Sequence, residues 1–191
     1  MEAFLISTGA VALAEIGDKT QLLAFILAAK FRRPLPIVAG VFVATLANHA
    51  LAGALGAWIA ALVRPEILRW ILGVSFMGMA AWTLIPDKFE ADDAKLTRLG
   101  VFGATLVAFF LAEMGDKTQI ATVALAAQYQ AFFAIVAGTT TGMMVANVPA
   151  VYLGERIARR MPVRLVQTIA AVIFAMLGIA TLLGAGARFG F

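Results

Sequence analysis

Six apolar stretches dominate this chain of 191 residues. A helix that crosses the hydrocarbon core of a bilayer needs about 20 apolar residues. The six stretches reach this length and cover residues 3–29, 35–63, 67–85, 99–127, 132–153 and 163–183. Hydrophobic residues make up 62% of the chain and charged residues only 14%, which is more apolar side chain than one soluble core can bury. The sequence therefore predicts an all-α integral membrane protein with six transmembrane helices. It excludes an ordinary soluble enzyme and, with no cysteine, a disulfide-rich secreted domain.

Positive charges between these stretches predict how the chain is oriented in the membrane. Ten Lys and Arg residues fall in the first, third and fifth connections, whereas only three fall on the opposite side with the two termini. Cytoplasmic loops carry the excess of positive charge. Both termini are therefore predicted on the outer side. The net charge of +4 is scattered along the chain, so no nucleic-acid partner is predicted.

The sequence repeats itself at an offset of 98 residues. The octet that begins at Ala14, AEIGDKTQ, returns at Ala112 as AEMGDKTQ, and 13 of the 26 positions from Glu15 to Gly40 are identical to their counterparts. This pattern predicts two three-helix repeats, residues 1–86 and 99–191, joined by a cytoplasmic linker over residues 87–98. Because three is odd, the second repeat enters the membrane from the opposite side, as in many secondary transporters.

Each octet places charged residues within an apolar stretch. On one continuous helix, Glu15, Asp18 and Lys19 project from the same face. Glu113, Asp116 and Lys117 repeat this spacing. An ionised group at the bilayer centre costs at least about 2.5–3.5 kcal/mol, so these side chains are expected to converge inside the bundle.

The composition of the two octets indicates a divalent cation. Four carboxylates and two ammonium groups carry a total charge of −2 when all are ionised. Carboxylates and the side-chain oxygens of Gln21 and Gln119 are hard ligands that suit Ca²⁺ or Mn²⁺. Protons and a metal ion compete for the same oxygens, which is the physical basis of an antiporter. The alternative is that Glu15–Lys19 and its copy are internal ion pairs that hold helices together.

The two Glu-x-Gly-Asp-Lys-[Ser/Thr] motifs, 98 residues apart, resemble those of uncharacterised protein family 0016. That family contains bacterial manganese exporters and the Golgi calcium/manganese–proton exchangers of eukaryotes, and the resemblance covers essentially the whole chain. It implies a cation/proton antiporter with two inverted repeats and an ion site formed by Glu15, Asp18, Glu113 and Asp116. It also implies supporting roles for Lys19, Lys117 and the Thr-Gln pairs Thr20-Gln21 and Thr118-Gln119. Eukaryotic members usually carry extra N-terminal sequence, so this chain is expected in a bacterial inner membrane.

Three further polar residues lie at similar depths in the second and fifth stretches. Asn48 and Asn147 are offset by 99 residues, so either they are equivalent after a one-residue slip or His49 is the counterpart of Asn147. Each amide can supply an oxygen to the ion or bond a neighbouring helix. His49, the single histidine, can relay protons, favour Mn²⁺ over Ca²⁺ or serve the structure.

The leading functional hypothesis is a proton-coupled exporter of Mn²⁺, or also of Ca²⁺, that works as a secondary active transporter. A passive divalent-cation channel and an antiporter selective for Ca²⁺ are the alternatives. An intramembrane enzyme is not favoured, because a Lys beside each Asp keeps the acids ionised. No cofactor is expected, since the metal is the transported substrate, and the oligomeric state is not predicted.

Overall fold

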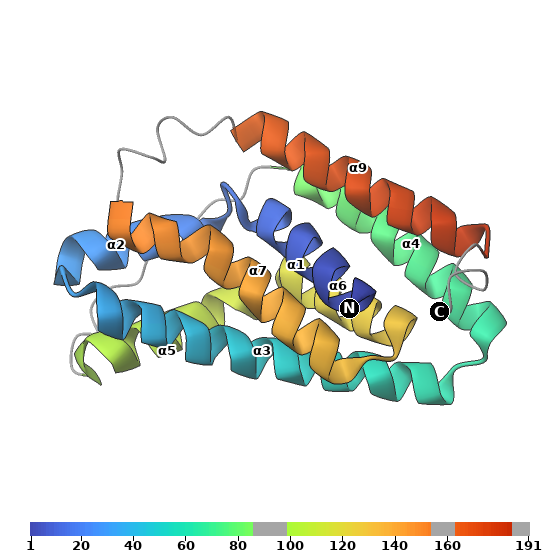
Figure 1. The fold of residues 1–191 in the computed structure, drawn as a ribbon, viewed down its shortest axis with the longest axis horizontal. Helices are drawn as coiled ribbons and strands as arrows, with labels where there is room; N and C mark the ends of the chain where they lie inside the picture. Colours follow the sequence, from blue (N-terminus) through green and yellow to red (C-terminus); the bar gives the residue numbers. More distant parts are fainter. Residues whose placement is uncertain (86–98, 154–162, 185–191) are drawn as a thin grey trace.

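Every element in the described part of this computed structural model, residues 1–85, 99–153 and 163–184, is a helix (Figure 1). The prediction of an all-α chain is confirmed for these residues. The helices are α1 (Glu2–Glu15), α2 (Lys19–Phe31), α3 (Pro34–Leu62), α4 (Pro65–Thr83), α5 (Gly100–Glu113), α6 (Lys117–Tyr129), α7 (Phe132–Leu153) and α9 (Val163–Leu182). The linker predicted over 87–98 lies outside the described residues.

The helices of the second half repeat those of the first at a constant offset. Helices α5, α6, α7 and α9 begin 98 residues after α1, α2, α3 and α4 respectively. Pro34 and Pro65 each stand at the start of a helix, where the missing N–H costs no hydrogen bond. The sequence repeat is thus also a repeat of helix boundaries.

The first and fourth apolar stretches are each broken into two helices, so the prediction of one continuous helix over 3–29 and over 99–127 is wrong. Gly17, between α1 and α2, has φ 83°, and Gly115, between α5 and α6, has φ 73°. These left-handed values interrupt a right-handed helix and favour glycine. The breaks fall within the two charged motifs.

Three helices of the described part are long and apolar enough to cross a membrane, namely α3, α7 and residues Arg164–Leu182 of α9. Helix α1 has 14 residues and is about 21 Å long, which is less than the ~30 Å hydrocarbon core. Helix α5 has the same length. A crossing in these regions therefore needs α1 together with α2, or α5 together with α6.

The two halves interlock. Helix α1 packs mainly on α7, and its counterpart α5 packs on α3. Near its end, α3 contacts the start of α7 through Gly53 and Val136, whereas Val41 and Ala44 of early α3 share a core cluster with Ala150 of late α7. The equivalent helices α3 and α7 therefore run antiparallel to each other (Figure 1).

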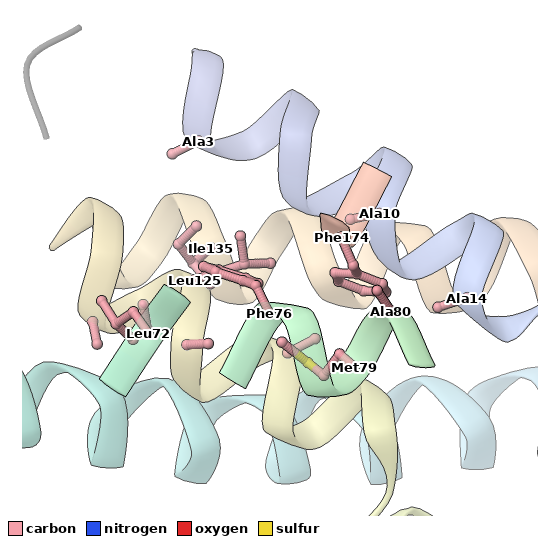
Figure 2. Close-up of a cluster of buried hydrophobic side chains, with 14 of the residues drawn as sticks. Ala3, Ala10, Ala14, Leu72, Phe76, Met79, Ala80, Leu125, Ile135 and Phe174 are labelled. Carbon is pink, nitrogen blue, oxygen red and sulfur yellow. The ribbon is translucent and has the colours of Figure 1, made fainter. Parts of the chain in front are cut away.

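Helices α4 and α9 lie side by side along one edge of the bundle (Figure 1). Figure 2 shows how an apolar cluster joins them to the rest, with Phe76 and Met79 of α4 packed near Phe174 of α9 and Leu125 of α6. Phe76 and Phe174 are repeat counterparts, and both are 1% exposed. This cluster anchors the outer helix pair to α1, α6 and α7. A second apolar cluster joins α2, α3, α5 and α7.

Candidate cation site

The break in each motif sets the positions of its charged residues. Glu15 is the last residue of α1, Asp18 precedes α2 as its N-cap, and Lys19 is the first residue of α2. The prediction that these three share one face of a continuous helix is therefore wrong, because Gly17 turns the chain between them. In the second motif Glu113 ends α5 and Asp116 caps α6, where its carboxylate accepts a 3.4 Å hydrogen bond from Thr118 N–H.

The side chains of Gln21 and Gln119 stabilise the two helix breaks. The backbone N–H of Gly17 donates to Gln21 Oε1 at 3.0 Å, and that of Gly115 donates to Gln119 Oε1 at 2.7 Å. Gln21 also donates from Nε2 to the carbonyl of Ala146 on α7, at 3.2 Å. The side-chain oxygens expected to face an ion thus hold the backbone of their own motif, and Gln21 also ties α2 to the other half.

The lysines pair across the two motifs. Lys19 Nζ lies 2.9 Å from Asp116 Oδ1, and Lys117 forms an ion pair with Asp18. The described residues show no Glu15–Lys19 pair, which was the alternative explanation of the motif. The two pairs differ in burial, since 21% of the Lys19 side chain is exposed but only 2% of that of Lys117. Each motif therefore neutralises the aspartate of the other.

Three of the four motif acids converge on one point. Glu15, Glu113 and Asp116 each offer a carboxylate oxygen, and these oxygens lie within 4.8 Å of one another. Both glutamates are fully buried and Asp116 is 1% exposed. Asp18 is equally buried but lies with Lys117 and is not a member of this group. The carboxylates come from the ends of α1 and α5 and the start of α6, so both halves contribute.

Neutral donors hold this carboxylate group on both sides. Asn147 Nδ2 of α7 donates to Glu15 Oε1 at 3.1 Å. Thr118 Oγ1 donates to Glu113 Oε2 at 3.0 Å and lies 3.3 Å from Asp116 Oδ2. Thr20, its counterpart, is buried, and its hydroxyl has no hydrogen-bond partner among the described residues. The supporting threonines therefore have unequal contacts in the two halves.

The other two predicted polar residues are also buried beside this region. Asn48 Nδ2 donates to the carbonyl of Phe110 at 3.1 Å, one turn before Glu113. His49 is fully buried, and within the described chain neither ring nitrogen has a hydrogen-bond partner. Sequence reasoning missed Thr45, a buried hydroxyl one turn before His49. It also missed the carbonyls of Ala146 and Phe110, which no sequence pattern marks.

Several buried side-chain oxygens of the candidate site have no hydrogen-bond partner among the described residues. They include Glu15 Oε2, Glu113 Oε1, Asn48 Oδ1 and Asn147 Oδ1. Buried polar atoms are nearly always satisfied, so such exceptions need an explanation. A cation is bound through oxygens of this kind, and the chemistry of the donor set therefore fits a hard divalent ion.

Comparison with known protein families matches residues 3–91 and 101–188 to the divalent cation/proton antiporter GDT1. The chain belongs to the GDT1 family. The resemblance drawn from the two motifs is thereby confirmed, as is the prediction of a multi-pass membrane cation/proton antiporter that is not an enzyme.

Relatives of this GDT1 chain occur in bacteria and plants. It is 52% identical over 182 residues to a Vibrio cholerae protein named "Putative manganese exporter", covering 95% of this chain and 90% of the relative. It is 28% identical to GDT1-like protein 3 of Oryza sativa, covering 91% of this chain and 71% of the relative. The same identity holds for GDT1-like protein 5 of Arabidopsis thaliana, covering 96% of both. No solved structure matches the chain.

Proposed function

We propose that this GDT1 protein exports Mn²⁺ from the bacterial cytoplasm in exchange for protons, and that the ion binds between the two motifs. The observation that carries the proposal is the buried meeting of Glu15, Glu113 and Asp116, whose oxygens lie within 4.8 Å of one another. The bacterial relative named as a manganese exporter supports Mn²⁺ as the substrate.

The proposed site takes its metal ligands from the motif acids. Glu15, Glu113 and Asp116 supply carboxylate oxygens from the converging group. Asp18, which is buried beside Lys117, is the fourth proposed acidic ligand. Lys19 and Lys117 balance the charge of the aspartates, which leaves −2 on the six groups when all are ionised. Thr118 supports Glu113 and Asp116 from the first turn of α6, and Thr20 at the equivalent position of α2 is available to support the acids when the ion binds. Gln21 and Gln119 stabilise the helix breaks at Gly17 and Gly115.

Proton coupling follows from the same oxygens. When the metal leaves, closely spaced carboxylates in a dry interior repel one another, and binding a proton relieves this repulsion. A carboxylate that holds a proton is a poor metal ligand. Metal and protons therefore occupy the site in alternation, and the exchange of one for the other is the transport cycle.

The proposed architecture has six spans in two inverted repeats, residues 1–86 and 99–191, joined by the linker 87–98. The 98-residue offset of the helix boundaries and the antiparallel course of α3 and α7 support it. The first and fourth spans then consist of α1 with α2 and of α5 with α6. Broken helices near the midplane are typical of transporter sites, and here the breaks hold the acids.

The orientation proposed for this protein places both termini on the periplasmic side of the inner membrane. In Figure 1 the α2–α3 connection, with Arg32 and Arg33, lies at the opposite end of the bundle from the α3–α4 connection, with Arg64. Ten basic residues belong to the side of the first connection and three to the other, and the richer side is cytoplasmic by the positive-inside rule.

Transport in proteoliposomes tests this function. With Mn²⁺ on one side, the wild-type protein is expected to carry Mn²⁺ across the membrane while protons move in the opposite direction. The rate of Mn²⁺ transport is expected to saturate with Mn²⁺ concentration and to depend on the pH gradient. Glu15→Gln and Asp116→Asn are expected to abolish both fluxes, whereas Glu66→Gln removes an acid from the exposed Arg64–Glu66 pair and serves as the control. Metal flux without proton movement would identify a channel, and a response to Ca²⁺ alone would identify a Ca²⁺-selective antiporter.

A further inference from the structure

His49 differs from the other polar residues near the site because both of its ring nitrogens are buried without a hydrogen-bond partner among the described residues. A neutral imidazole always carries one donor and one acceptor. Leaving both unpaired in a membrane interior is costly. The residue therefore needs a partner that the contacts between described residues do not supply.

The contacts of the neighbouring helices show where His49 lies. On α7, Gly138 faces Phe4 and Ser7 of α1, and on α3, Gly40 faces Phe102 and Thr105 of α5. Each member of the second contact differs from its counterpart by 98 residues. The α3–α5 contact thus repeats the α1–α7 contact in exact register, with no slip of one residue.

This register relates His49 and Glu113 to a pair of residues in the other half. Asn147 of α7 donates to Glu15 at the end of α1, and at an offset of 98 the corresponding residues are His49 and Glu113. Asn48, the adjacent residue, already bonds the carbonyl of Phe110, which fixes α3 beside α5 one turn before Glu113. By the repeat, His49 therefore corresponds to Asn147 as Glu113 corresponds to Glu15. In the described residues His49 forms no hydrogen bond with Glu113, and it is not among the three residues whose ligand atoms lie within 4.8 Å of one another.

The chemistry of this pair is complementary. Glu113 Oε1 has no hydrogen-bond partner in the described chain, and Glu113 belongs to the group of three converging carboxylates. We propose that His49 is a further ligand of the transported ion, binding through an imidazole nitrogen beside Glu113. This inference rests on the proposed function, because it adds a ligand to the same site.

An imidazole at this position makes the ion site chemically asymmetric. One half presents the amide of Asn147 and the other presents a nitrogen ligand. Imidazole suits first-row transition metals, whereas Ca²⁺ prefers oxygen ligands alone. His49 is then the residue that sets the preference for Mn²⁺ over Ca²⁺, which the carboxylates by themselves do not provide.

Pulsed EPR of bound Mn²⁺ tests the proposal, because His49 is the only histidine in the chain. The full-length protein is purified without a histidine tag, once at natural abundance and once with ¹⁵N-labelled histidine, and loaded with Mn²⁺. We expect a ¹⁴N modulation of the Mn²⁺ signal that changes to ¹⁵N on labelling. His49→Asn is expected to lose it, and the exchange variant His49→Asn/Asn147→His is expected to regain it.

Affinity measurements form the second arm. His49→Asn is expected to weaken Mn²⁺ binding by about tenfold while Ca²⁺ binding stays within about threefold. Bound Mn²⁺ without a histidine-derived modulation, or an equal loss for both ions, would overturn the role of His49 but leave the antiporter intact. If the wild-type protein binds no Mn²⁺, both the ligand and the proposed function are wrong. The labelled wild-type comparison decides the question even if the variants do not fold.

Discussion

Lys19 of the first motif pairs with Asp116 of the second at 2.9 Å, and not with Glu15 four residues before it. The reciprocal pair joins Lys117 to Asp18. Because each lysine neutralises the aspartate of the other half, neither motif is electrostatically complete alone. The two crossed pairs tie the halves together directly beside the three converging carboxylates.

Cross-linking tests the crossed arrangement, and the natural absence of cysteine makes it simple. In a Lys19→Cys/Asp116→Cys variant, a short bifunctional thiol reagent is expected to link the two peptides, because the two side chains meet in the structure. Mass spectrometry after digestion detects the product. A Lys19→Cys/Glu66→Cys variant serves as the control, since Glu66 is exposed and pairs with Arg64. Equal linking in both variants would contradict the arrangement.

Removing the lysine charges is expected to destabilise the protein unequally. Lys117→Met takes the ammonium group away from a buried aspartate, and breaking a buried pair in this way costs about 3–5 kcal/mol. Lys19→Met is expected to cost less, because 21% of the Lys19 side chain is exposed against 2% for Lys117. Thermal unfolding in detergent measures both variants. The same loss of Tm in each would show that burial does not distinguish the two pairs.

Gly115→Ala is expected to destabilise the break between α5 and α6. Its φ of 73° costs an L-residue roughly 1–2 kcal/mol, although a Cβ there meets no atom within 4 Å. Gly78→Ala is the matched control, because it also has open space but lies within α4, where alanine is favoured. Tm is expected to fall in the first variant and to stay level or rise in the second. A fall in neither would mean that the break does not depend on glycine.

Asn147→Ala removes the donor that holds Glu15 at 3.1 Å. Losing a residue that orients a metal ligand typically weakens binding by about 10–100-fold, and we expect a loss of this size in the Mn²⁺ affinity measured by calorimetry. Thr141→Val on the same helix is the control, since Thr141 is exposed and, within the described residues, its hydroxyl bonds the carbonyl of Ala137 in its own helix. Unchanged affinity in Asn147→Ala would remove Asn147 from the proposed site.

Phe76→Ala tests the apolar cluster that anchors α4 (Figure 2). Deleting a fully buried Phe costs about 3–5 kcal/mol, because a cavity is left behind. A clear loss of Tm is therefore expected. Val74→Ala, at a position of α4 that is 62% exposed, is expected to change Tm much less. Similar losses for both would mean that the cluster does not anchor the helix pair.

The sequence predicted the helical class and the burial of the motif acids, for a clear reason. Apolar stretches of bilayer length and charges such as Glu15 and Asp116 within them are local features of the sequence. The cost of a charge in lipid then requires burial, and all four motif acids are indeed buried. The offset of 98 residues likewise anticipated the repeated helix boundaries.

The helix breaks at the two motif glycines were not predicted from the sequence. Gly17 and Gly115 lie within apolar stretches long enough to be predicted as single transmembrane helices. Glycine also occurs inside regular helices, so the sequence does not show that these two glycines have positive φ angles. The roles of Gln21 and Gln119 depended on the same breaks. Once the chain turns at each glycine, its N–H loses a helical partner and takes the glutamine oxygen instead.

By itself the sequence determined that this chain is helical, duplicated and charged inside its apolar regions, because hydrophobicity and repetition are properties of neighbouring residues. Only the tertiary structure decided which charges meet. Pairing Lys19 with Asp116 and bringing Glu15 to Glu113 joins residues about a hundred positions apart. Their approach depends on how α1 packs on α7 and α5 on α3. This packing depends on the fit between the surfaces of helices that are distant in the sequence, so it cannot be read from any one segment.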